Sequence, residues 1–129
     1  MSDRSFRGPF LLGIDVGTTL TKSVVFDLEG NEVAVSRLPT TVHHPQQTYS
    51  EVNMEEIWTS VKDTVRQLIF EVGIDPDGIL GIGISSTVGG VWLLDESKRP
   101  FRPAILWNDG RAGSILARWE VEGRMQEIF

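Results

Sequence analysis

The chain has 129 residues, a net charge of −6, 40% hydrophobic residues and no cysteine, which is enough for one modest domain with its own core. The acidic balance lacks the basic footprint of proteins that bind nucleic acid or anionic membranes, and the absence of cysteine excludes a disulfide framework and a thiolate metal site. Because the polar residues 1–9 precede no apolar stretch long enough for a signal sequence or membrane span, we predict a cytoplasmic protein.

Three antiparallel strands are predicted after a flexible N-terminal segment at residues 1–9. Apolar or alternating residues predict these strands at 11–14, 22–26 and 32–38. The second and third are separated only by the turn residues 27–31, and Pro39 ends the third. Because consecutive strands joined by short turns must run in opposite directions, the three form an antiparallel meander.

A long amphipathic helix is predicted next, after a polar connection at 39–53. Asn53 and Glu56 have the spacing of a capping box, and apolar residues recur behind them at helical intervals as far as Gly73. The run ILGIGIS at 79–85 then predicts a buried strand that lies close to a helix. The element order is therefore β-β-β-α-β.

A hairpin and a second helix complete the chain. Short strands are expected at 90–95 and 104–107, and a helix from Gly110 to Gly123. The apolar pattern that starts after Gly123 has no room to finish, so we expect an incomplete domain. Trp58 and Trp119 fall on the apolar stripes of the two helices and are expected in the core.

The turn between the first two strands has the composition of a phosphate-binding loop. Gly17 can adopt the positive φ of a tight turn and leaves backbone N–H groups accessible, and Thr18 and Thr19 add hydroxyl donors. Asp15 supplies a carboxylate that can hold Mg²⁺ through water, and Lys22 supplies a positive charge for a phosphate. On these residues alone, an ordinary hairpin whose side chains bond their own turn backbone stays open.

Three blocks make the chain resemble the N-terminal part of the FGGY family of carbohydrate kinases, which includes xylulokinase, glycerol kinase and L-xylulose kinase. They are GIDVGTTLTK at 13–22, YSEVNMEEIW at 49–58 and GIGISSTVGGVWLLDESKRPFRPAILWNDGRA at 81–112. The resemblance extends from Leu11 to about Trp119 and implies an α/β fold of the actin-like ATPase (RNase H-like) type. This fold has a mixed sheet of three antiparallel strands followed by parallel strands, with flanking helices. Residues 10–129 would be the N-terminal part of the first of two domains.

The resemblance also implies roles for the residues of the turn. Asp15 matches the family's Mg²⁺-associated aspartate, Thr18 and Thr19 match phosphate-loop residues beside Gly17, and Lys22 matches a basic position near the nucleotide phosphates. ATP and Mg²⁺ are the implied cofactors.

Six positions are implied on the sugar side of the cleft. They are Glu51, Val88, Gly89, Trp107, Asn108 and Asp109. Val88 and Gly89 depart from the family, which places Arg-Glu or Met-His there. Two further roles stay open: Glu51 as a solvated residue before the helix, and Asp109 or Asn108 as the N-cap of the second helix. Arg111 also matches the family.

The implied activity is transfer of the ATP γ-phosphoryl group to a hydroxyl of a ketose, with a pentulose favoured, or of a polyol. The family's base aspartate and most of its adenosine site are expected downstream of this chain, so we predict that the chain alone is inactive. The alternatives are a non-catalytic actin-like protein that polymerises or switches with ATP, and a kinase that has lost activity. The sequence leaves a homodimer open and favours neither nucleic acid nor membrane as a partner.

Overall fold

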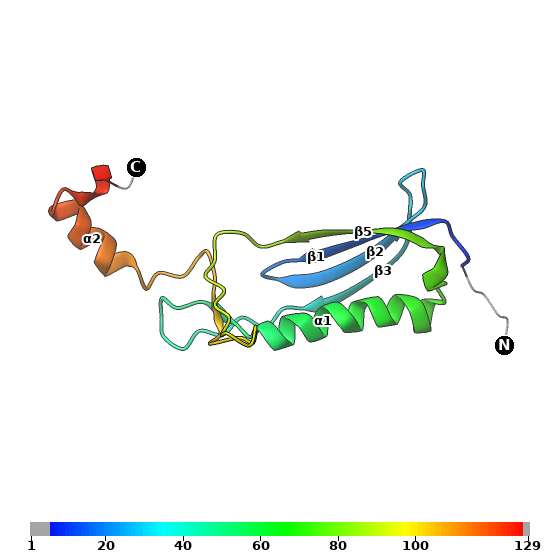
Figure 1. Cartoon of the computed structure of the whole chain (residues 1–129), viewed down its shortest axis with the longest axis horizontal. Coiled ribbons are helices and arrows are strands. Elements are labelled where there is room, and N and C mark those ends of the chain that lie inside the picture. Colours follow the sequence, from blue (N-terminus) through cyan, green and yellow to red (C-terminus); the bar gives the residue numbers. More distant parts are fainter. Residues whose placement is uncertain (1–5, 128–129) are drawn as a thin grey trace.

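The computed structural model describes residues 6–127 of the chain, and its main body is a four-stranded sheet covered on one face by a helix (Figure 1). The strands lie in the order β3-β2-β1-β5. Their bounds are β1 Phe10–Val16, β2 Leu20–Phe26, β3 Glu32–Pro39 and β5 Ile79–Ser86. β1, β2 and β3 form an antiparallel meander, and β5 runs parallel to β1, so the predicted element order and mixed sheet are confirmed.

The segment expected to be flexible, residues 1–9, lies partly outside the described residues. Within the described part, Phe6 forms a bridge to Ile74, with its N–H donating to the carbonyl of Gly73 at 2.8 Å and its carbonyl accepting from Asp75 at 2.9 Å. None of the helices in residues 6–127 is long and apolar enough to cross a membrane.

The two turns of the meander use glycine differently. Gly30 has φ +87° in the second turn, where Asp27 accepts hydrogen bonds from the backbone and side-chain nitrogens of Asn31, both at 2.8 Å. The prediction of a positive φ at Gly17 is wrong, because Gly17 is not among the glycines with positive φ. Gly17 is instead crowded: an added Cβ would lie 3.0 Å from the carbonyl oxygen of Leu20.

The predicted long helix is present as α1, Met54–Arg66, continued by a π-helical segment, Gln67–Val72. The Asn53 side chain accepts hydrogen bonds from the backbone N–H groups of Glu55 at 2.9 Å and Glu56 at 3.4 Å, which confirms the N-cap. The helix ends at Gly73, which adopts the left-handed conformation expected of a C-terminal glycine.

Replacing the N-cap tests how much this helix start contributes to stability. We expect Asn53→Ala to lower the free energy of unfolding by about 1 kcal/mol, because two backbone N–H groups lose their acceptor. Asn53→Asp keeps an acceptor at the same place and is expected to stay close to the parent. Urea unfolding followed by circular dichroism measures both, and equal losses in the two variants would contradict the capping role.

The core lies between the sheet and α1 with its π-helical extension. It consists of Phe10, Leu12, Ile14, Val25, Leu68 and Ile74. Side chains alternate across a strand, so the inward residues of β1 and β2 face the helix while their neighbours face the other side of the sheet. Two side-chain hydrogen bonds bridge the layers among the described residues: one of 2.8 Å between the hydroxyls of Ser23 and Thr64, and one from the hydroxyl of Ser36 to Oε1 of Gln67.

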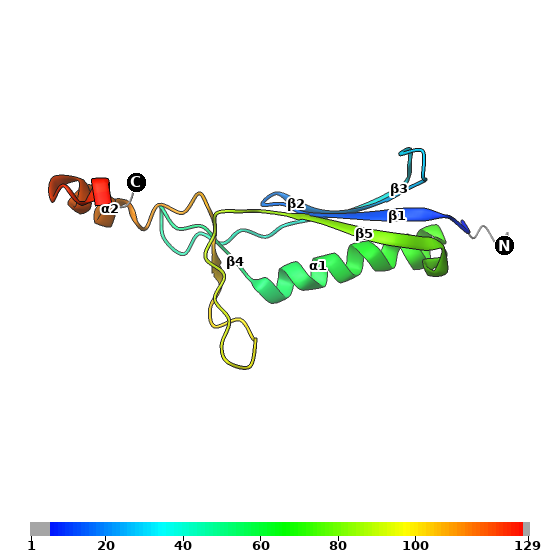
Figure 2. The same cartoon turned by 45° about the horizontal axis from the view of Figure 1, so that its top comes forward.

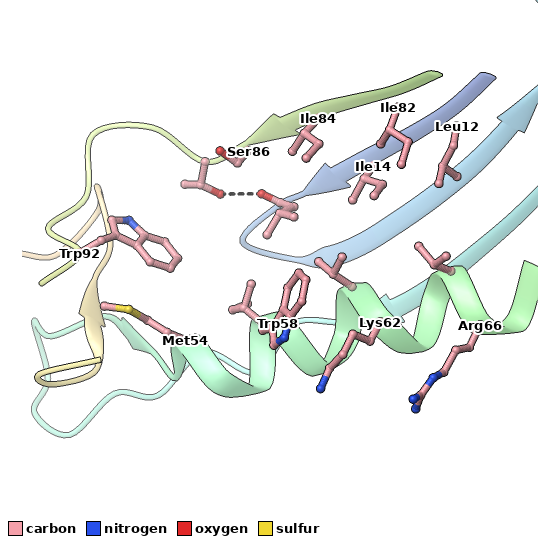
Figure 3. Close-up of a pocket in the computed structure, with 15 residues that line it drawn as sticks. Leu12, Ile14, Met54, Trp58, Lys62, Arg66, Ile82, Ile84, Ser86 and Trp92 are labelled. Atoms are coloured by element: carbon pink, nitrogen blue, oxygen red, sulfur yellow. Dashed lines mark hydrogen bonds between the residues drawn. The ribbon is translucent and has the colours of Figure 1, made fainter. Parts of the chain in front are cut away.

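The prediction that residues 79–85 form a buried strand is wrong, because β5 is the edge strand and most of its residues are exposed. Ile82 and Ile84 of β5 line an apolar groove of about 840 Å³ between the sheet and α1 (Figure 3). Trp58 lines the same groove from α1 and is 58% exposed, so its predicted burial is wrong too. Apolar side chains are exposed here because α1 covers mainly β1, β2 and β3.

A second, two-stranded sheet has one strand at the end of the polar connection predicted at 39–53 and the other within the short strand predicted at 104–107. β4, Glu51–Val52, pairs antiparallel with β6, Ala104–Ile105, and buries Val52, Ala104 and Leu106. The predicted strand at 90–95 is reduced to single bridges, from Val91 to Ile105 and from Leu94 to Pro100. This small sheet joins the start of α1 to the hairpin region.

The second helix, α2, Gly113–Val121, extends away from the sheet at the end opposite the N-terminus (Figure 2). It starts three residues later than predicted, and Ala112 occupies the N-cap position without a side-chain hydrogen bond. The prediction that Asp109 or Asn108 caps it is therefore wrong. Trp119 is only half-buried, against the expectation of a core position, and stacks with Arg124.

Candidate functional site

The candidate site is a cavity of about 380 Å³ beyond the carboxyl ends of the parallel strands β1 and β5. Three distant parts of the sequence line it: Asp15 to Thr18, Ser86 to Val88, and Trp107. In open α/β sheets, ligands bind at the carboxyl ends of the strands. The structure therefore brings together the predicted phosphate turn and two of the predicted sugar-side residues.

The turn is braced on both sides by threonines that the sequence analysis did not single out. Thr40 donates its hydroxyl to the carbonyl of Gly17 at 2.9 Å, and its N–H donates to the carbonyl of Thr19 at 3.0 Å. On the other side, Thr87 donates both its N–H and its hydroxyl to the carbonyl of Val16 at 3.0 Å. The turn carbonyls are thus occupied. These contacts could not be predicted from local sequence. Each threonine follows a strand, and only the folded sheet brings that strand's end next to the turn.

Asp15 and Lys22 lie opposite each other on β1 and β2 and line a second cavity of about 420 Å³. Asp15 borders both cavities, whereas Lys22 borders only the second, and Thr19 is exposed and borders neither. Among the described residues, neither Asp15 nor Lys22 has an ion-pair partner. Both charges are therefore available to a ligand.

Val88 and Trp107 form the other side of the first cavity, and Gly89 lies next to Val88 outside its lining. Val88 is 82% exposed, and Trp107 is also exposed. Gly89 has φ +79°, and a Cβ there would lie 3.4 Å from the Cβ of Trp107. A side chain at Gly89 would strain the backbone at this positive φ, and its Cβ would contact Trp107. Asn108 is exposed and lies outside the cavity.

Glu51 and Asp109 do not line the cavity, because arginines hold both carboxylates. Arg111 donates from Nε to Asp109 Oδ1 at 2.7 Å and from Nη2 to Asp109 Oδ2 at 2.8 Å. The same Nη2 donates to Glu51 Oε1 at 2.6 Å, and Arg102 Nη2 donates to that oxygen at 2.5 Å. The sequence patterns gave no sign of Arg102, since only the pairing of β4 with β6 brings it to Glu51.

Hydrogen bonds within this cluster stabilise the charged forms of Asp109 and Arg111. The hydrogen bond from Arg111 holds the pKa of Asp109 well below its usual 3.8, and Asp109 and Glu51 raise the pKa of Arg111 in return. Because the pKa of Asp109 is lower in the folded state, the cluster contributes stability above the unfolded pKa. That contribution is lost as the pH falls toward the folded pKa.

The sequence profile of the FGGY family of carbohydrate kinases, N-terminal domain, matches residues 10–129 of the chain. The chain belongs to this family. It is 36% identical over 120 residues to an L-xylulose/3-keto-L-gulonate kinase from Escherichia coli, covering 93% of this chain and 24% of that protein. A glycerol kinase from Natranaerobius thermophilus is 31% identical over 120 residues, with 92% and 24% covered.

The solved structures agree with the family assignment. A ligand-bound xylulose kinase from Lactobacillus acidophilus superimposes with a TM-score of 0.82 and 28% identity, covering 92% of this chain and 24% of the other. The chain spans about a quarter of the length of the curated relatives it matches. The sheet described above is thus the actin-like fold of the family, as the sequence predicted.

Proposed function

We propose that the full-length protein is an ATP-dependent carbohydrate kinase that phosphorylates a hydroxyl of a ketose, with a pentulose favoured, or of a polyol. The proposal rests on one observation above all: Asp15 and Thr18 of the phosphate turn line the same cavity as Trp107. A kinase needs a phosphate-binding wall and a sugar-binding wall within reach of each other. The names of the relatives, L-xylulose kinase and glycerol kinase, support the choice of a ketose or a polyol.

Each residue of the cavity has a proposed role. The Thr18 hydroxyl and the backbone N–H groups of the turn other than that of Gly17, which donates to the carbonyl of Leu20 at 3.0 Å, would bind phosphate oxygens. Lys22 would offset negative charge from the neighbouring cavity. Trp107 would pack its ring against the carbon skeleton of the sugar.

Asp15 fits a magnesium ion bound together with phosphate. Mg²⁺ usually takes one or two carboxylates, keeps several waters and completes its shell with substrate phosphates. The Asp15 carboxylate borders both cavities, and within residues 6–127 no cluster of three or more acidic or histidine side chains could hold a metal on its own. Bound there, the ion would neutralise charge that develops on the transferring phosphoryl group.

We also propose that residues 1–129 alone do not catalyse phosphoryl transfer. Phosphoryl transfer depends on positioning and on charge stabilisation from all sides of the reacting group. Asp15 is the only aspartate among the described residues that line the cavity. The base that accepts the sugar hydroxyl proton is therefore expected elsewhere in the protein.

The proposal is tested by ADP release from the full-length protein with Mg²⁺ and ATP. A panel of pentuloses, hexuloses and alditols is offered one at a time, with no sugar as the control. We expect ADP release that depends on at least one ketose or alditol. ATP hydrolysis that no sugar stimulates would overturn the kinase proposal, and polymerisation on ATP addition, followed by light scattering, would favour the non-catalytic switch.

A further inference from the structure

Two carboxylates that the family resemblance places near the sugar are occupied by protein contacts instead. The Asp109 side chain is 2% exposed and the Glu51 side chain 11% exposed, and both bind Arg111. Asp109 accepts four hydrogen bonds, two on each oxygen, which leaves no lone pair for a substrate hydroxyl, whereas on Glu51 only Oε1 has partners among the described residues. The cluster of Glu51, Asp109 and Arg111 is called the arginine clamp below.

The arginine clamp is built for rigidity. Arg111 binds both oxygens of Asp109 through Nε and Nη2, which is the two-pronged geometry that only a guanidinium can make. Its guanidinium also stacks 4.1 Å from the centre of the Tyr49 ring. With Glu51 as a further partner of Nη2, the guanidinium of Arg111 is held through Nε, through Nη2 and through its contact with the Tyr49 ring.

The backbone on both sides of Trp107 is bonded to Ser50, and the clamp supplies the bond that follows Trp107, through Asp109. Before it, the N–H of Leu106 donates to the carbonyl of Ser50 at 2.9 Å. After it, the N–H of Asp109 donates to the carbonyl of Leu106 at 3.1 Å, and the Asp109 carboxylate accepts from the N–H of Ser50 at 2.7 Å. Trp107 itself remains exposed and borders the cavity. The turn that carries Trp107 is thus held by hydrogen bonds, while its indole is exposed at the cavity.

We propose that Arg111 is a positioning residue for the sugar: through Asp109 and Glu51 it fixes the turn that presents Trp107 to the cavity. This inference rests on the proposed kinase function. Arg111 does not line the cavity, so its effect on the sugar passes through Trp107. A displacement of about 1 Å in a positioning group can cost up to about 100-fold in rate, so a modest loosening of the clamp has a measurable effect.

Arg111→Lys in the full-length protein is the direct test, because lysine keeps the charge but cannot make the two-pronged contact. We expect the KM for the sugar to rise about tenfold, while the KM for ATP changes less than about twofold. Arg99→Lys is the matched control, since Arg99 forms an exposed ion pair with Asp95 on the neighbouring hairpin. An equal rise in both KM values, or none, would overturn the proposal.

A double-mutant cycle with Trp107→Ala separates positioning from a general structural defect. If Arg111 acts through Trp107, Arg111→Lys should cost little further in kcat/KM for the sugar once the indole is gone. The full loss of the single variant, repeated in the Trp107→Ala background, would overturn the proposal. Glu51→Gln is a second variant of the clamp, to be used if Arg111→Lys does not fold. It is expected to raise the KM for the sugar about threefold.

Hydrogen exchange separates failure of this inference from failure of the kinase proposal. We expect the amides of residues 106–110 to exchange about tenfold faster in Arg111→Lys than in the parent or in Arg99→Lys, whether or not the protein turns over any sugar. Unchanged exchange would overturn the clamp even in an active kinase. Faster exchange in a protein with no sugar-dependent turnover would refute the kinase proposal and leave the fixed turn standing.

Discussion

Asp15→Ala is expected to lower sugar-dependent ATP turnover of the full-length protein by at least about 100-fold, the scale seen when one preorganised charge contact is lost. Among residues 6–127, Asp15 is the only acidic residue that lines both cavities of the site. Its removal would leave a phosphate-bound magnesium ion without its proposed protein partner. Asp15→Asn keeps the size of the side chain and removes its charge, so we expect a similar loss. The measurement is steady-state ADP release at saturating sugar, with Mg²⁺ varied.

The control for Asp15 is Glu29→Ala. Glu29 is an exposed carboxylate in the turn between β2 and β3, outside both cavities. This variant removes the same charge from the same sheet and should keep the parent rate. Near-normal turnover in Asp15→Ala, with folding verified by circular dichroism, would contradict the magnesium role.

Leu68→Ala is expected to lower the free energy of unfolding by about 2–5 kcal/mol. Leu68 is 1% exposed and packs in the core between the sheet and the π-helical segment that extends α1. The substitution removes buried methyl groups and leaves a cavity, while alanine keeps the helical backbone. Urea unfolding of the chain, followed by far-UV circular dichroism, measures the change.

Phe70→Ala is the matched control for Leu68. Phe70 lies two residues away in the same π-helical segment but is 80% exposed. Its truncation should change the free energy of unfolding by no more than about 0.5 kcal/mol. Equal losses in the two variants would mean that the segment does not pack as described.

Much of the fold could be predicted from the sequence because its signals are local. The alternation in β2 and β3, the cap at Asn53 and the glycines at 30 and 73 each specify structure within a few residues. A parallel strand after the helix was implied by the family resemblance, and β5 pairs parallel with β1. The phosphate turn was likewise predicted from its amino-acid composition alone.

The sequence could not predict what depends on distant partners. The run at 79–85 has the composition of a buried strand, yet β5 is an exposed edge, because burial depends on which elements pack on a strand. Trp58 is exposed for a similar reason: it faces a groove rather than a filled core.

The arginine clamp shows the same limit at the candidate site. Asp109 follows a strand and precedes a helix, which is typical of an N-cap, but its carboxylate turns instead to Arg111 and Ser50. These contacts join residues up to 60 positions apart, such as Glu51 and Arg111. Sequence spacing does not predict these contacts, because they form only when β4 pairs with β6.

The central claim is that the cavity beside Asp15 and Thr18 is the phosphoryl-transfer end of a carbohydrate-kinase cleft. A crystal structure of the full-length protein with Mg²⁺, a non-hydrolysable ATP analogue and the sugar that gives turnover tests it most directly. We predict terminal phosphate oxygens within hydrogen-bonding distance of the Gly17–Thr18 turn, Mg²⁺ bridged to Asp15 through water, and the sugar against Trp107. Nucleotide phosphates bound away from residues 15–22 would contradict the claim.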